Sequence, residues 1–166
     1  MNNTKILTYR PLRQFVMKRL FWYALPNLVL NGIIPYVNFE NPLAVALFQG
    51  EYCFARFILP MALFVPFAIT VDCMKKTNAF MLSIELSDVR GKEGMDLRVF
   101  LKYGICNGLL TFAVLLLMLC IVQGLIPSNY VFNGLLLSAF NGITACLLAV
   151  YFTLWSIRKL EKLVND

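Results

Sequence analysis

Four long apolar segments constrain the fold of this chain more than any other feature of its sequence. They cover residues 20–37, 53–73, 103–126 and 130–157. A helix needs about 20 apolar residues to cross roughly 30 Å of hydrocarbon, and each segment approaches or exceeds that length. Helices are preferred because each satisfies its own backbone groups in lipid, and the segments lack the alternation of membrane β-strands. The sequence therefore predicts an all-α integral membrane protein, a four-helix transmembrane bundle formed as a single domain over residues 1–166.

The composition favours a membrane as well. Hydrophobic residues make up 60% of the 166 residues and charged residues only 14%, whereas soluble domains carry about 25% charged residues. Such a chain has too few charged side chains to cover its surface with them, so much of that surface should contact lipid. No small-residue cleavage site follows the first apolar segment, so we expect that segment to be retained as a span.

Basic residues predict the orientation. Fourteen of the fifteen Lys and Arg residues lie before the first span, between spans two and three, or after span four, and the exception is Arg56. The other two connections contain Glu40 and Glu51 but no basic residue. Basic loops stay on the cytoplasmic side, so both termini and the loop 74–102 are predicted to be cytoplasmic, in a cell inner (plasma) membrane. This basic face should meet anionic lipid and not nucleic acid.

The two halves of the chain have the same orientation in the membrane, since each is a two-span hairpin that starts and ends on the side of the basic residues. A parallel duplication of a two-helix hairpin is one interpretation, distinct from the inverted repeats of many transporters. It depends on three pairs of basic residues that are each 83 residues apart: Arg19 and Lys102, Lys75 and Arg158, Lys76 and Lys159.

The connections between spans differ in length. The short turn at 127–129 predicts that spans three and four are antiparallel neighbours. The longer connection at 38–52 contains the apolar run 43–48, which is too short to span. We expect this run to lie flat at the interface, and a re-entrant segment is the alternative. Residues 78–89 are predicted to form a short interfacial helix.

Polar residues inside the spans are costly in lipid and should face inward. They form stripes, with Asn27 and Asn31 following Tyr23 at spacings of four in span one, and Asn107 following Tyr103 in span three. Two interpretations stay open: hydrogen bonds between helices, or a polar path for a small solute or ion. The candidate residues for either role are Asn27, Asn31, Arg56, Asn107, Asn133, Asn141 and Thr144.

Small residues recur at the same spacing and indicate close helix packing. Because span four carries this face and a separate Asn-bearing face, it is predicted to be central in the bundle or shared with another subunit. The predicted packing residues are Gly104, Gly108, Gly134, Ser138, Gly142 and Cys146. Two charged residues also fall within span two. Arg56 is expected to reach headgroups, pair with a nearby Glu or bind an anion, and Asp72 to form a local ion pair with Lys75 or Lys76.

No residue pattern points to catalysis. The chain has no histidine, which removes the commonest general base and transition-metal ligand. It also lacks a CxxC pair, an acidic pair at metal spacing and a Gly-rich phosphate loop. We therefore predict no catalytic residue, no cofactor and no metal site. The acidic residues Glu85, Asp88, Glu93 and Asp96 have basic neighbours and are typical of a solvated loop.

One hairpin carries a resemblance. The segments Phe54-Ala55-Arg56-Phe57-Ile58-Leu59-Pro60 and Phe64-Val65-Pro66-Phe67-Ala68, followed by Lys75-Lys76, are similar to the second span of small two-span bacterial inner-membrane proteins of unknown function. The resemblance covers residues 15–77 and implies a bacterial inner-membrane setting. It implies no functional residue.

Two classes of function remain. In the first, the chain is a non-enzymatic, oligomeric transporter or channel component, whose polar stripes line a path. In the second, it is an accessory or scaffold subunit that docks a partner membrane protein. Both classes expect a lipid bilayer around the chain, with either a homo-oligomer or another membrane protein as partner.

Overall fold

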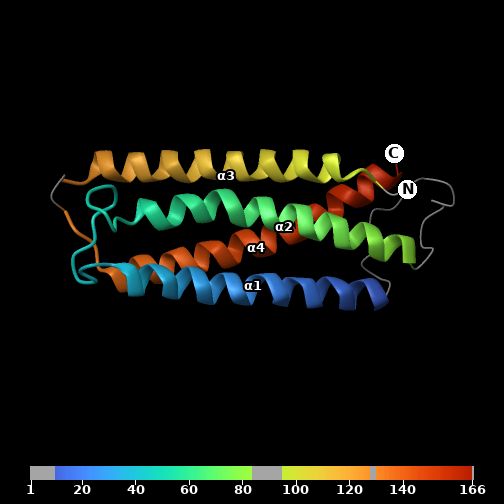
Figure 1. Cartoon of the computed structure of the whole chain (residues 1–166), viewed down its shortest axis with the longest axis horizontal. Coiled ribbons are helices and arrows are strands. Elements are labelled where there is room, and N and C mark those ends of the chain that lie inside the picture. Colours follow the sequence, from blue (N-terminus) through green and yellow to red (C-terminus); the bar gives the residue numbers. More distant parts are fainter. Residues whose placement is uncertain (1–9, 84–94, 128–129, 166) are drawn as a thin grey trace.

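The computed structural model describes residues 10–83, 95–127 and 130–165, and these residues form four long helices (Figure 1). The helices are α1 (Arg10–Asn38), α2 (Ala55–Ser83), α3 (Leu97–Leu125) and α4 (Gly134–Asn165). All four contain stretches long and apolar enough to cross a membrane. The predicted four-helix transmembrane bundle is therefore confirmed, and the chain is a multipass membrane protein.

Four helix ends extend well beyond the predicted spans. α1 begins at Arg10, α2 ends at Ser83, α3 begins at Leu97 and α4 continues to Asn165. A helix carries its own hydrogen bonds, so it does not have to stop where the apolar residues stop. The short interfacial helix predicted at 78–89 is wrong over 78–83, which are the end of α2, and residues 84–89 lie outside the described residues.

The helices form two packed pairs, α1 with α4 and α2 with α3, which join where α2 packs against α4 (Figure 1). α1 and α2 have a much smaller contact, and the backbones of α3 and α4 do not approach. The prediction that spans three and four are neighbours is therefore wrong. The short turn at 127–129 is only part of the connection, which runs from Ile126 to Asn133. Eight extended residues can reach about 26 Å, so the connection does not force the two helices together.

Glycines allow the two pairs to pack closely. A Cβ at Gly108 would lie 2.6 Å from the Leu63 carbonyl oxygen of α2, and one at Gly142 would lie 2.7 Å from the Leu28 carbonyl oxygen of α1. Because backbone atoms cannot move aside as a side chain can, a larger residue at either position would separate the helices. Close backbone approach is how helices gain packing energy in lipid.

In this arrangement, the first helix of each hairpin packs on the second helix of the other hairpin. A parallel duplication would produce that exchange, because equivalent helices would make equivalent contacts. The duplication itself stays a prediction.

We call the end of the bundle formed by residues 39–54, 126–127 and 130–133 the loop end. The opposite end, where α1 begins and α4 ends, is the basic end. At the loop end, Val45 and Phe132 exchange two backbone hydrogen bonds of 2.9 and 2.8 Å. Val45 and Leu47 are buried, whereas Leu43 is 80% exposed. The run 43–48 thus packs across the helix ends with alternate side chains inward. It lies at the end of the bundle and does not descend between the helices as a re-entrant segment would (Figure 1). That it lies flat at the membrane interface stays a prediction.

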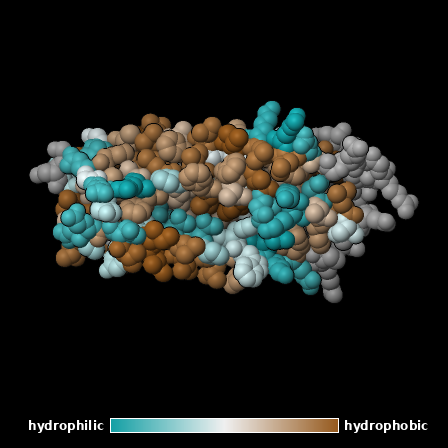
Figure 2. Space-filling view, in the orientation of Figure 1, coloured by the Kyte–Doolittle hydropathy of each residue, from teal (hydrophilic) through white to brown (hydrophobic). Residues whose placement is uncertain are grey.

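The outer surface is largely apolar. In Figure 2, hydrophobic residues cover much of the middle of the visible face and hydrophilic residues gather mainly toward the two ends. Large exposed hydrophobic side chains occur on all four helices, among them Trp22, Phe64, Leu117 and Leu136. So much exposed apolar surface is unusual for a water-soluble monomer and is normal for one surrounded by lipid.

Candidate functional site: polar clusters between the helices

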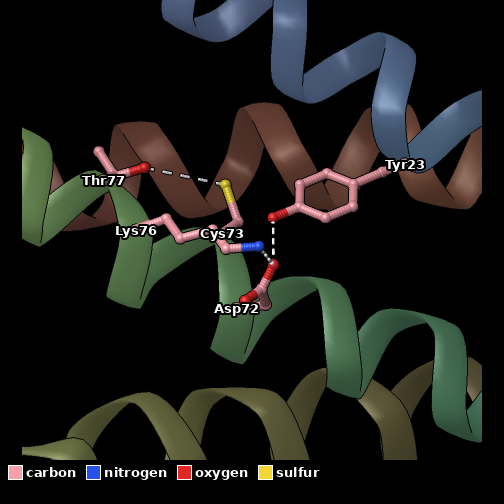
Figure 3. A network of polar contacts seen from close by, with 5 residues as sticks. All are labelled: Tyr23, Asp72, Cys73, Lys76 and Thr77. Atoms are coloured by element: carbon pink, nitrogen blue, oxygen red, sulfur yellow. Dashed lines mark hydrogen bonds and ion pairs between the residues drawn. The ribbon is translucent and has the colours of Figure 1, made fainter.

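The most connected polar cluster joins α1 to α2 about halfway along the two helices (Figure 3). The Tyr23 hydroxyl of α1 donates to Asp72 Oδ2 of α2 at 2.5 Å, and Lys76 Nζ donates to the same oxygen at 2.5 Å. The predicted local ion pair of Asp72 is confirmed for Lys76. The added partner is Tyr23, which the sequence placed in a stripe on span one without indicating its contact. The carboxylate thus links α1 to α2, two helices with only a small backbone contact.

Aromatic and cationic groups extend this contact toward the basic end. Phe15 stacks on Phe80 with ring centroids 4.4 Å apart, and the Arg19 guanidinium lies 4.9 Å above the Phe15 ring. Within the described part of the chain, the buried Arg19 Nε has no hydrogen-bond partner. These contacts fix the start of α1 against the end of α2 without close backbone packing.

Cys73 extends the cluster to a third helix. Its Sγ lies 3.7 Å from the Thr153 carbonyl oxygen of α4 and 3.9 Å from Thr77 Oγ1. All three side chains are buried. Cys73 is therefore a weak polar contact inside the core, as expected for a buried thiol.

A second cluster lies between α1 and α4. Asn141 Nδ2 donates to the Asn31 carbonyl oxygen at 2.8 Å. Along α1, Asn31 Nδ2 donates to the Asn27 carbonyl oxygen at 3.0 Å, and Asn27 Nδ2 donates to the Tyr23 carbonyl oxygen at 2.8 Å. Asn141 is the member that bonds between helices, while Asn27 and Asn31 mainly bond within their own helix.

Asn107 belongs to a different interface. Its Nδ2 donates to Thr70 Oγ1 of α2 at 3.0 Å, and its carbonyl oxygen accepts from Thr111 Oγ1 at 2.8 Å. Because α3 contacts neither α1 nor the backbone of α4, the structure does not bring Asn107 together with Asn31. The candidate asparagines therefore do not surround a common space.

Asn133 corrects the sequence prediction. It was placed inside span four, but it precedes α4, and its Oδ1 accepts hydrogen bonds from the backbone nitrogens of Leu135 at 2.8 Å and Leu136 at 3.4 Å. Asparagine is a favoured cap because its side chain satisfies amides that the helix leaves unpaired. Thr144, the third candidate on span four after Asn133 and Asn141, is partly buried within α4.

Arg56 lies at the loop end, in the first turn of α2, and points away from the bundle core. Its guanidinium donates to the Glu51 carbonyl oxygen at 2.7 Å, lies 3.7 Å from Glu51 Oε1, and stands 5.6 Å from the centre of the Tyr52 ring. Of the expected roles, pairing with a nearby Glu is the one that the structure shows. An exposed pair of this kind contributes about 0–1 kcal/mol.

The small-residue face of span four packs within the chain. Gly142 contacts Gly32 and Leu28 of α1, and Gly134 faces Phe39 and the Pro42 carbonyl oxygen. Ser138 is buried and Cys146 partly buried, and on α3 Gly104 faces Phe67 and Val71 of α2. Span four was predicted to be central in the bundle or shared with another subunit. In the structure α4 packs against both α1 and α2, so it is central in the bundle of its own chain.

An open groove on α4 near the basic end was missed by sequence reasoning. It has a volume of about 340 Å³ and is lined by Tyr151, Leu154, Trp155, Arg158, Lys159 and Lys162. Trp155, Arg158 and Lys162 follow at spacings of three and four, so they share one helix face. That spacing could have indicated the groove, but the basic residues were interpreted only as markers of orientation.

The described residues contain no group of three or more His, Cys, Asp or Glu side chains that could hold a metal ion. No protein-family model, curated protein or solved structure matches the chain. The resemblance to two-span bacterial membrane proteins therefore stays a prediction.

Proposed function

We propose that this chain is a non-enzymatic membrane subunit that uses the free face of α3 to bind another membrane protein, with a second copy of the chain as the first candidate. The supporting observation is that α3 packs its backbone against α2 alone. α1, α2 and α4 each contact at least two other helices. α3 also meets α4 through side chains at the basic end, where Tyr103 contacts Trp155. The rest of the circumference of α3, away from α2, is left for lipid or for a partner.

The free face of α3 is apolar and long enough to form a helix–helix contact across the membrane. Leu110 and Leu117 are 63% and 62% exposed. Cys106 and Cys120 are also exposed, and 14 residues of helix place them about 21 Å apart along nearly the same face. In lipid, such a face associates through shape and van der Waals packing, since it gains nothing from leaving water.

The exposed cysteines provide a test in native membranes. A membrane-permeant bifunctional maleimide should join two copies through Cys106 or Cys120 and give a species of twice 18.9 kDa. An adduct of another discrete mass would support a different membrane partner in the same docking role. The Cys106→Ala/Cys120→Ala variant should give neither.

A matched control is needed to distinguish docking from crosslinks that form when two copies collide at random in the membrane. In that cysteine-replaced variant, Leu30→Cys presents a thiol on α1 with 55% exposure, against 63% for Leu110→Cys on α3. Docking through α3 requires that Leu110→Cys crosslinks and Leu30→Cys does not. Equal crosslinking at both positions, or none at either, would contradict the proposal.

A transport role is the second candidate, and one observation favours it. Three buried polar atoms of α4 lack a hydrogen-bond partner among the described residues: Ser138 Oγ, Asn141 Oδ1 and Ser156 Oγ. Water could occupy such positions and link them into a path. Ala145 and Ala149, both fully buried, separate the first two atoms from the third. Cation flux into proteoliposomes that is lost in Ser138→Ala and in Ser156→Ala would favour transport, whereas docking alone predicts no flux.

A further inference from the structure

The groove on α4 has the composition of an anion site. Three of its six lining side chains, Arg158, Lys159 and Lys162, are basic, and none is acidic. Within the described part of the chain, none of the three forms an ion pair, although Glu161 follows on the same helix outside the lining. Three basic side chains around one concave surface attract an anion, because their fields add.

Two aromatic side chains, Tyr151 and Trp155, also line this groove. Trp155 meets Tyr103 of α3 edge to face with ring centroids 5.9 Å apart, and Lys159 Nζ lies 5.2 Å from the centre of the Tyr103 ring. Lys159 is thereby held beside the Tyr103 ring, while Arg158 and Lys162 are exposed. Trp and Tyr beside Lys and Arg is the combination found where a helix leaves the hydrocarbon and enters the headgroup layer.

An apolar stripe runs from the groove toward the loop end. Its residues are Leu136, Phe140, Ile143, Leu147 and Tyr151, all more than half exposed. Their spacings of four, three, four and four place them on one face of α4. Tyr151 belongs to both the stripe and the groove. Fifteen residues of helix extend about 22 Å, which exceeds the roughly 15 Å of one hydrocarbon leaflet.

We propose that the groove binds the phosphate headgroup of an anionic phospholipid, whose acyl chain lies along this stripe. Arg158 and Lys162 supply the charged donors to the phosphate oxygens, and an arginine fork suits phosphate geometry. A soluble anion would use the basic groove but not the stripe, and a neutral lipid would use the stripe but not the charges. Only an anionic lipid satisfies both parts.

Trp155 allows the site to be tested in the full-length protein. The chain has two tryptophans, so Trp22→Phe leaves Trp155 as the only indole. The protein is placed in phosphatidylcholine vesicles that contain increasing amounts of brominated phosphatidylglycerol or, in parallel, brominated phosphatidylcholine. We expect Trp155 fluorescence to be half-quenched at a several-fold lower mole fraction of the anionic lipid.

The basic residues should account for that selectivity. Arg158→Gln with Lys162→Gln should abolish that several-fold selectivity, because each basic residue near the membrane surface contributes about fivefold. The matched control is Lys75→Gln with Lys102→Gln, which removes the same charge from exposed positions at the same end but outside the groove. Arg158→Lys with Lys162→Arg keeps the charge and should keep the selectivity, which separates loss of binding from loss of folding.

Three outcomes would overturn the proposal. Equal quenching by the two brominated lipids would show that the groove does not select an anionic lipid over a neutral one. Equal loss in the two Gln pairs would assign the selectivity to the basic end as a whole. Inorganic phosphate that changes Trp155 fluorescence in pure phosphatidylcholine as strongly as the anionic lipid does would identify a soluble-anion site.

Discussion

At the scale of single residues, Tyr23 is the side chain whose removal tests the link between α1 and α2. Its hydroxyl donates to a carboxylate that Lys76 also contacts, and hydrogen bonds to charged groups are stronger than neutral ones. Tyr23→Phe should lower the free energy of unfolding in detergent by about 1–2 kcal/mol. Tyr36→Phe, on the same helix but in an exposed side chain, should change it by less than about 0.5 kcal/mol. Equal effects in thermal denaturation would mean that the Tyr23 hydrogen bond adds no stability.

At the scale of helices, the contact between α1 and α4 depends on Gly142. Because a Cβ there would meet backbone atoms of Leu28 and Gly32 at 2.7 and 3.1 Å, Gly142→Ala must displace α1, at a cost of about 1–3 kcal/mol. Gly124 on α3 has no atom within 4 Å of its Cβ position, so Gly124→Ala should be neutral or stabilise by about 0.5–1 kcal/mol. Unfolding in detergent measures both, and a Gly142→Ala variant as stable as Gly124→Ala would contradict the packing. The expected loss is one of folding within one chain, and not of assembly between chains.

At the scale of the whole molecule, the basic end should face the cytoplasm. The first and last helices of the bundle both have their chain-terminal ends there (Figure 1), and the outward transfer of clustered Lys and Arg is disfavoured. A reporter fused after Asp166 should therefore read cytoplasmic, and one inserted at Ser128 should read periplasmic. The same signal at both positions would contradict this topology, because α4 alone lies between them and a single crossing places them on opposite sides.

The number of spans and the helical fold were predictable from the sequence because each depends on a local sum. Transfer of about 20 neighbouring side chains into lipid is favourable or not regardless of the rest of the chain. The ion pair of Asp72 with Lys76 was predictable for the same reason, since four residues of helix bring the two together. The spacing of Gly104 and Gly108 likewise indicated close packing, but not that α2 would supply the surface.

Only the tertiary structure decided which helices are neighbours and what each polar residue bonds. A short turn suggested that α3 would lie beside α4, yet α3 packs on α2 and α4 on α1, because the glycines of each pair fit a backbone far away in the sequence. That choice places Asn141 with Asn31 and Asn107 with Thr70, and leaves Asn133 to cap a helix. Hydropathy is a property of one segment, whereas a helix contact is a match between two surfaces, so the sequence determined how many helices cross the membrane and the tertiary structure determined which of their faces remain free.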